Sequence, residues 1–248
     1  MTAVALDRTI FGEEHDAFRE MVRAFAEKEV APNLADWNAA GTVDRQLFQI
    51  AGRLGLLGFG VDESLGGGGT DDFRFNAVLI EELNRVGAQA VTMGLSGFND
   101  LVAPYLMSLC TAEQKQRYLP SLCSGDQISA LAITEPGAGS DLSAIATTAR
   151  LDGDDYVVSG SKIFISNGIL ADVLVTVVAT DPTAGRHGFS ILLIDADSAG
   201  VAKHGPLHKV GLAAQDTAQL YFDNVRVPRS NLLGEEGRAW EYLRHNLS

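Results

Sequence analysis

The stretch AITEPGAGSD, residues 132–141, places a proline and two glycines directly after a short apolar run that is typical of a buried strand. We expect the proline, Gly137 and Gly139 to give the backbone an unusual path. Backbone N–H groups in such a turn can converge on an anion, and the Ser140 hydroxyl can add a donor. The stretch is neither a Walker loop, because no Lys-Ser/Thr pair follows the glycines, nor a dinucleotide fingerprint, because no helical pattern opens after them. Composition alone therefore favours a tight loop between two strands over a ligand loop.

A second stretch, GSKIFISNG at residues 160–168, lies further along the same half of the chain. On a strand, Phe164 and Ser166 would share one face and Ile165 would lie on the other. An aromatic ring beside a hydroxyl suits the face of a planar heteroaromatic ligand with hydrogen-bonding edges. The alternative is a strand that carries an ordinary core aromatic.

Composition limits the classes of function. The chain has 248 residues, enough for one large domain or two smaller ones. Its net charge of −13 argues against nucleic acid or an anionic membrane as a partner. No apolar run is long enough to span a membrane, and the N-terminus lacks the pattern of a signal peptide. Cys110 and Cys123 have no metal-type or redox-type spacing, so we expect structural thiols, no bound metal and a reducing cytoplasm.

The first half of the chain has the period of helices. Apolar residues recur at helical spacing in residues 13–32, 44–58 and 73–87. Thr111 and Gln114 form a predicted capping box for a further helix, which Pro120 should end or bend.

From about Ile128 the period changes to that of strands. Residues 172–180 and 188–195 are nearly all apolar, which indicates strands covered on both faces. Several strands at short spacing suggest an antiparallel sandwich or small barrel, and hence an α+β protein. We expect a helical domain at residues 1–127, a β-domain at 128–236 and the start of a further helical domain at 237–248.

Three segments together resemble the acyl-CoA dehydrogenases, particularly the long-chain type. They are TEPGAGSD, then GSKIFISNG, then KVGLAAQDTAQLYFDNVRVPRSNLLGEEGRAW at residues 209–240. The resemblance runs from about residue 10 to the end of the chain. It implies an N-terminal helical domain and a middle β-domain, with a C-terminal helical bundle that would lie beyond residue 248 and be missing from this chain.

The resemblance also implies the site. Thr134 would lie near the reactive edge of the flavin of FAD, and Ser140 would contact the pyrophosphate and lie near the acyl-CoA substrate. Arg186 and His187 would contact the CoA part of the substrate, although a solvated loop is an equal alternative for them. The residues expected to bind the cofactor are Leu131, Ala132, Ile133, Thr134, Gly139, Ser140, Phe164, Ile165 and Ser166.

The implied reaction is the α,β-dehydrogenation of a fatty acyl-CoA thioester in fatty acid β-oxidation. A carboxylate removes the α-proton while the β-hydrogen leaves as hydride to the flavin, and an electron-transferring flavoprotein accepts the electrons. The family's base is a glutamate of the C-terminal domain, beyond Ser248, so we name no catalytic residue. Glu135, inside the flavin loop, is expected to shape the loop rather than act as base, and Glu241 replaces a substrate-side tyrosine of the long-chain type. We therefore expect these residues alone to be inactive.

Two alternatives remain. The chain could be a non-catalytic flavin-binding or assembly subunit of the same family, paired with a partner that supplies the missing helices. It could also belong to a related flavoenzyme such as an acyl-CoA oxidase. In the complete protein we expect a homo-oligomer, either a dimer or a tetramer.

Overall fold

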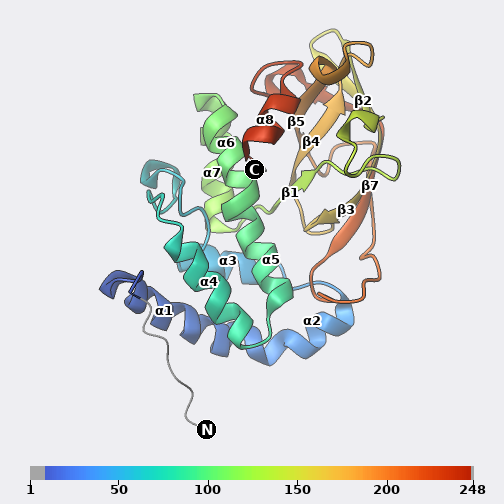
Figure 1. Cartoon of the computed structure of the whole chain (residues 1–248). Helices are drawn as coiled ribbons and strands as arrows, with labels where there is room; N and C mark the ends of the chain where they lie inside the picture. Colours follow the sequence, from blue (N-terminus) through green and yellow to red (C-terminus); the bar gives the residue numbers. More distant parts are fainter. Residues whose placement is uncertain (1–8, 247–248) are drawn as a thin grey trace.

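Helices make up the first half of the chain and strands most of the second, as Figure 1 shows for the computed structural model. The structure describes residues 9–246. Residues 1–8 and 247–248 lie outside this range. The start of the predicted helical domain at 1–127 and the end of the predicted segment at 237–248 therefore fall outside the described residues. The helices are α1 Glu13–Phe25, α2 Leu34–Ala40, α3 Gln46–Arg53, α4 Arg74–Arg85, α5 Gln89–Gly97, α6 Ala103–Leu109, α7 Ala112–Ser124 and α8 Ala239–Asn246.

The predicted capping box at the start of α7 is confirmed. The backbone N–H of Gln114 donates to Thr111 Oγ1 at 3.2 Å, and the N–H of Thr111 donates to Gln114 Oε1 at 2.9 Å. Pro120 does not end this helix, which was one of the two expected outcomes. The helix continues to Ser124 and stops at Gly125, whose φ is 75°. Pro120 cannot donate a backbone hydrogen bond within the helix, but burial of the helix's apolar face offsets this loss.

One long helical segment is absent from the helices that the sequence predicts. Helix α5, a π-helical turn at Phe98–Val102 and α6 follow one another end to end through the middle of the helical layer (Figure 1). Most of its side chains are buried, and two of its exposed side chains, Met93 and Leu101, are themselves apolar. Such a helix shows no polar face, so the period that reveals a surface helix is absent from its sequence.

The strands form one mixed sheet in the order β6-β7-β3-β2-β4-β5-β8, with β1 added beside β4. The sheet confirms a helical domain followed by a β-domain. A wholly antiparallel sheet is wrong, because β1 and β2 both run parallel to β4. The chain makes a loop and the β2–β3 hairpin after β1, and it therefore returns as β4 in the same direction. The strands are β1 Ser129–Ala132, β2 Thr148–Asp152, β3 Asp155–Ser166, β4 Val173–Ala179, β5 Phe189–Asp195, β6 Val201–His204, β7 Thr217–Pro228 and β8 Leu232–Leu233.

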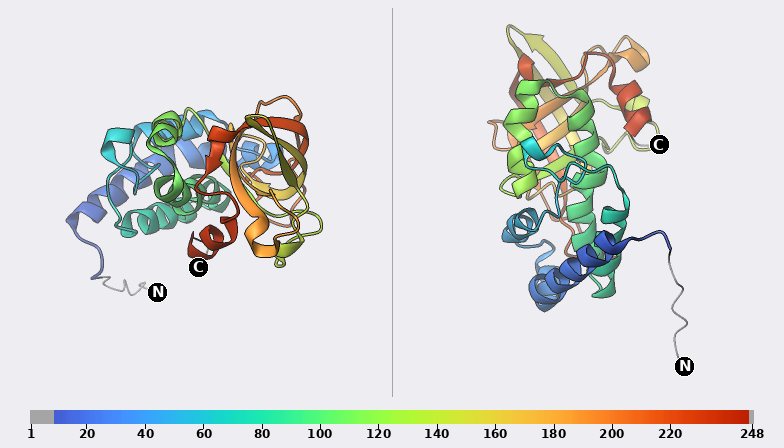
Figure 2. Two further views of the ribbon diagram at one scale, coloured as in Figure 1. Left: turned by 90° about the horizontal axis from the view of Figure 1, so that it is seen from above. Right: turned by 90° about the vertical axis from the view of Figure 1, so that its left-hand side faces the viewer.

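Strand β4 contributes to two hydrophobic cores. Val173, Val175 and Val177 belong to the core that the sheet shares with the helices, whereas Leu174 and Val178 belong to a second core inside the curl of the sheet. Figure 2 shows the helices gathered on one side of this sheet. All seven β4 residues are buried, which confirms the prediction of a strand covered on both faces.

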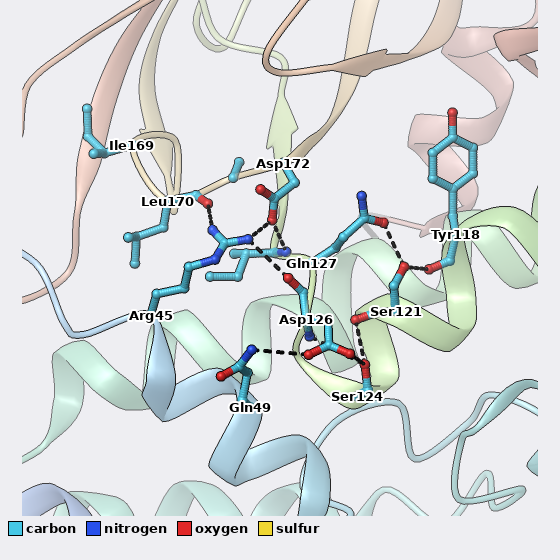
Figure 3. A network of polar contacts seen from close by, with 12 residues as sticks. Arg45, Gln49, Tyr118, Ser121, Ser124, Asp126, Gln127, Ile169, Leu170 and Asp172 are labelled. Atoms are coloured by element: carbon cyan, nitrogen blue, oxygen red, sulfur yellow. Dashed lines mark hydrogen bonds and ion pairs between the residues drawn. The ribbon is translucent and has the colours of Figure 1, made fainter.

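Arg45, immediately before α3, joins the two domains at the beginning of β1 (Figure 3). Its guanidinium donates to the carbonyls of Leu170 at 2.8 Å and Asp126 at 3.1 Å, and it forms an ion pair with Asp172. The Asp172 carboxylate also accepts the backbone N–H of Ile128 at 2.8 Å. One arginine therefore fixes the place where the chain passes from helices to strands.

Within residues 9–246 no helix combines the length and the apolar character needed to cross a bilayer. Cys110 and Cys123 are both free thiols, and burial raises the pKa of each to about 12. No cluster of potential metal ligands occurs in this part of the chain.

Candidate functional site

The loop that follows β1 begins with a short hairpin. The backbone N–H of Glu135 donates to the Ala138 carbonyl at 2.9 Å, and that of Ala138 donates to the Glu135 carbonyl at 3.1 Å. Gly137 and Gly139 have no positive φ, and a Cβ built on either would meet nothing within 4 Å. The expectation that these glycines set the backbone path is therefore wrong. They leave the surface of the loop bare of side chains, so that a ligand can approach its backbone closely.

The same loop is held from beneath by a buried ion pair. Lys162 Nζ donates to Glu135 Oε1 at 2.7 Å and to the Ile133 carbonyl at 2.9 Å. The Glu135 carboxylate also accepts the backbone N–H groups of Ala146 at 2.7 Å and Thr147 at 3.0 Å. Three donors thus engage the Glu135 carboxylate, and the Glu135 side chain is only 6% exposed. Glu135 therefore shapes the loop, as expected, and is not a free base.

Both members of this pair are charged at neutral pH. Burial opposes ionisation of Glu135, but hydrogen bonds from Lys162, Thr147 and Ala146 hold the pKa of the carboxyl below its ordinary value. Burial lowers the pKa of Lys162 to about 8, which still leaves the amine protonated at pH 7.

Phe164 points outward from β3 with unusual backbone geometry. Its φ is 61°, its side chain is 65% exposed, and the pairing of β3 with β7 shifts register between Lys162 and Ile165. A bulky residue in the left-handed region costs about 1–2 kcal/mol, and such residues cluster at functional sites. Ser166 is also exposed and Ile165 is buried, so the two faces are as predicted.

A hollow of about 170 Å³ lies beside Phe164, between the end of β3, the strand β1 and the helical segment α5 with its π-helical turn. The structure brings together here six of the residues expected to bind the cofactor, namely Leu131, Ile133, Thr134, Phe164, Ile165 and Ser166. Ile165 can offer only its backbone, because its side chain lies in the inner core of the sheet. Within residues 9–246 no carboxylate lines this hollow.

Three expected cofactor residues are not in the lining. The Ala132 side chain is fully buried in the inner core of the sheet. Gly139 and Ser140 are exposed on the loop outside the hollow. Among residues 9–246 the N–H groups of Gly137, Gly139 and Ser140 meet no protein acceptor, so they remain available to an anion.

The two residues expected to contact CoA lie elsewhere. Arg186 and His187 are exposed in the short turn Gly185–Gly188 between β4 and β5. The Arg186 guanidinium stacks over the ring of Trp240 on α8 at 4.9 Å from the centroid. Neither residue lines the hollow, so any ligand that touches both regions must extend between them.

Sequence reasoning missed the helical wall of the hollow. Met93, Gly97 and Leu101 line it at intervals of four residues, which places them on one helix face. Met93 is 46% exposed and Leu101 is 39% exposed, although both are large and apolar. The four-residue spacing could have predicted this helix face. It did not stand out, because the segment has no polar face to contrast with it. Asn167, with φ 59°, completes the wall and donates to the Gly94 carbonyl at 3.0 Å.

These features fit a flavin dinucleotide. An apolar hollow with an exposed aromatic ring suits the planar flavin, and a bare loop with free N–H groups and a hydroxyl suits a pyrophosphate. The hollow and the loop are consecutive in the chain, joined at Thr134. One extended ligand could therefore contact both.

The chain matches two domain families. Residues 12–126 match "Acyl-CoA dehydrogenase, N-terminal domain", and residues 130–225 match "Acyl-CoA dehydrogenase, middle domain". It is 43% identical over 242 residues to the mitochondrial long-chain specific acyl-CoA dehydrogenase of Sus scrofa, covering 97% of this chain and 56% of that protein. It is 37% identical over 228 residues to the short-chain specific enzyme of Clostridium acetobutylicum, covering 92% and 59%. The chain thus spans little more than half the length of these relatives.

Solved structures agree. The acyl-CoA dehydrogenase from Geobacillus kaustophilus superposes with a TM-score of 0.92 at 45% identity, covering 96% of this chain and 62% of that one. A chain in the structure of the electron transferring flavoprotein of Acidaminococcus fermentans gives 0.90 at 36% identity, covering 96% and 62%. A glutaryl-CoA dehydrogenase from Mycobacterium smegmatis in complex with FADH2 gives 0.80 at 30% identity, covering 93% and 58%.

Proposed function

The chain belongs to the acyl-CoA dehydrogenase family, whose N-terminal and middle domains it contains, and on that premise we propose that it forms the FAD- and thioester-binding part of an enzyme that dehydrogenates a fatty acyl-CoA between Cα and Cβ. The observation that carries the proposal is the hollow beside the exposed Phe164, followed directly in the chain by a bare loop that offers free N–H groups. We propose domain limits of 1–127, 128–236 and 237–248.

FAD as the cofactor is supported by the donor set and by the FADH2 complex of the Mycobacterium smegmatis relative. When bound, the flavin supplies the acceptor for the hydride. In our proposal Phe164 packs against the flavin ring, Thr134 lies near its reactive edge, and Ser166 borders it. Ala132 and Ile165 contribute backbone only, because their side chains are buried. The backbone of Gly139 and the hydroxyl of Ser140 bind the pyrophosphate.

The thioester is proposed to lie between the hollow and the loop. Ser140 would contact it from the loop, and Arg186 and His187 would bind the CoA portion. The stacking of Arg186 on Trp240 holds the guanidinium in the turn between β4 and β5, where its charge is exposed to an anionic ligand. The apolar side chains of Met93 and Leu101 exclude water from the opposite wall.

The proposed base is a carboxylate outside residues 9–246, because none lines the hollow and Glu135 is committed to the buried pair. Residues 1–248 alone are accordingly proposed to bind ligands without dehydrogenating them. The identity of 43% to a long-chain enzyme, against 37% to a short-chain enzyme, supports a long-chain substrate and a place in β-oxidation. An electron-transferring flavoprotein as the electron acceptor, and a homo-oligomer as the complete assembly, are part of the same proposal.

A second candidate is a non-catalytic flavin-binding or assembly subunit of this family. The absence of a carboxylate from the hollow, within residues 9–246, is the observation that favours it. The two candidates differ in whether the reaction appears when a C-terminal domain that carries the catalytic carboxylate is added. Fusing residues 1–248 to the C-terminal part of the Bacillus subtilis acyl-CoA dehydrogenase, a relative at 38% identity, tests this difference directly.

The first experiment is a visible absorption spectrum of the purified chain with FAD and then with a long-chain acyl-CoA. We expect a bound-flavin band that the thioester does not bleach. Bleaching would show that a base is present, and no flavin band would refute the proposal. Phe164→Ala should weaken FAD binding, whereas Phe73→Ala should not. The two side chains are 65% and 64% exposed, but Phe73 lies away from the hollow.

A further inference from the structure

We propose that Lys162 is a positioning residue for the flavin loop, which we define as residues 133–147 between β1 and β2. The buried ammonium group of Lys162 fixes Thr134 and both ends of this loop in the geometry that meets the ligand. The inference rests on the proposed function, because it assigns a role to a residue that does not itself line the hollow. Lys162 is fully buried beneath the loop and reaches no solvent.

Lys162 and Ile163 together bind Thr134 and the residues immediately before and after it. The Lys162 ammonium donates to the carbonyl of Ile133 and to the carboxylate of Glu135, the residues immediately before and after Thr134. The backbone N–H of Ile163 donates to the Thr134 carbonyl itself at 2.9 Å. Three consecutive residues of the loop are thus bound to two consecutive residues of β3.

Glu135 extends this hold to the far end of the loop. Its two carboxylate oxygens accept the N–H groups of Ala146 and Thr147, eleven and twelve residues further along. Thr147 Oγ1 in turn donates to the Ser161 carbonyl at 3.3 Å. Gly160 permits this approach, because a Cβ on it would lie 2.5 Å from Thr147 Oγ1. One ammonium group therefore closes the loop at its beginning and, through one carboxylate, at its end.

The bulge in β3 couples the lysine to the exposed aromatic. In a regular strand residues 162 and 164 would point to the same face. The register shift after Lys162 and the positive φ of Phe164 turn the lysine inward and the phenylalanine outward. The position of the ring at the hollow therefore depends on the same short segment that delivers the ammonium group to the loop.

A lysine is a poor choice if stability alone is required. Replacing a buried ion pair by apolar residues of similar volume is often neutral or stabilising, because both charges lose their hydration. The Lys162–Glu135 pair instead fixes backbone groups in place. It forms hydrogen bonds with one carbonyl and two backbone N–H groups at set positions, which an apolar pair cannot do. This is the property that a ligand-binding loop needs.

The test compares Lys162→Met with Lys203→Met, each assayed for FAD affinity by quenching of flavin fluorescence. Lys203 is a matched control, because its Nζ also donates to two backbone carbonyls, those of Ile169 and Ala171. Neither of these residues lines the hollow, whereas Ile133, which Lys162 holds, does. We expect Lys162→Met to weaken FAD binding by about tenfold or more, as loss of a charged hydrogen bond predicts. Lys203→Met should change it by less than about twofold. Equal affinities for native chain and Lys162→Met would overturn the inference while leaving the proposed function intact.

A second variant covers the case in which Lys162→Met does not fold. Glu135→Gln keeps the shape of the pair but removes its negative charge and weakens its hold on the Ala146 and Thr147 amides. We expect faster hydrogen exchange at these two amides in the ligand-free chain, together with an altered absorption band and reduction potential of bound flavin. Unchanged exchange and an unchanged potential would also overturn the inference. If the native chain takes up no FAD at all, the proposed function fails and the inference fails with it.

Discussion

The backbone at Phe164 can be tested by replacing it with glycine and, separately, with alanine. Both changes remove the same aromatic side chain, which is 65% exposed, so the lost packing is common to both. They differ in the cost of φ 61°, which is about 1–2 kcal/mol for an L-residue and near zero for glycine. After allowance for the greater freedom of glycine in the unfolded chain, Phe164→Gly should be more stable than Phe164→Ala by about 1 kcal/mol. In a chain of this size that is a difference of about 2–4 °C in melting temperature.

Thermal and urea unfolding of the ligand-free chain, followed by far-UV circular dichroism, measure this difference. Ser166 provides the control, because it points outward from the same strand but has ordinary backbone geometry. There the order should reverse, with Ser166→Ala more stable than Ser166→Gly by about 0.5–1 kcal/mol. If alanine is favoured at both positions, Phe164 is not strained and the reasoning about the bulge is wrong.

Three further changes test other parts of the structure. Arg45→Met should lower the free energy of unfolding by about 1–3 kcal/mol because three charged contacts are lost, whereas Arg53→Met, at the exposed last residue of α3, should have little effect in urea titrations. Thr111→Ala should cost about 1 kcal/mol for the lost cap, and Gln114→Ala about 2 kcal/mol, because the buried amide also donates to two backbone carbonyls near β8; differential melting compares the two. Burial lowers the pKa of Lys162 to about 8, while the unfolded value is about 10.4, so between these pH values the unfolded chain binds more protons than the folded one. The native chain should therefore gain stability relative to Lys162→Met as pH rises from 8 to about 10, and a falling difference would contradict the direction of this shift.

Elements whose pattern of apolar and polar residues reflects which of their faces are buried were predictable from the sequence. Strands β4 and β5 are apolar throughout because both faces are covered, and α1 and α4 alternate because one face meets water. The segment α5 to α6 was not predicted because most of its residues are buried and Met93 and Leu101 on its exposed face are apolar, so its sequence lacks that contrast. The parallel pairing of β1 with β4 also escaped prediction, because it depends on the return path of the chain and not on either strand's residues.

The site was predictable where residues are contiguous in the chain. Residues 131–134 and 164–166 were placed from two short segments, and most of them meet at the hollow. Met93 and Leu101 come from a third segment that only folding brings near. The buried role of Lys162 could not be read from strand alternation, because the bulge after it resets which face each residue occupies.

Because β4 contributes to two cores, the helical segment that the first family model matches does not complete its hydrophobic core by itself. The matched segments 12–126 and 130–225 divide the chain near Gln127, yet Val175 and Val177 complete the core of the helices from the far side of that division. Cutting the chain there would expose a valine face on one fragment and an unfilled interior on the other. The loop after β1 begins only a few residues past the same point, so the hollow lies where the helices and the sheet share one core.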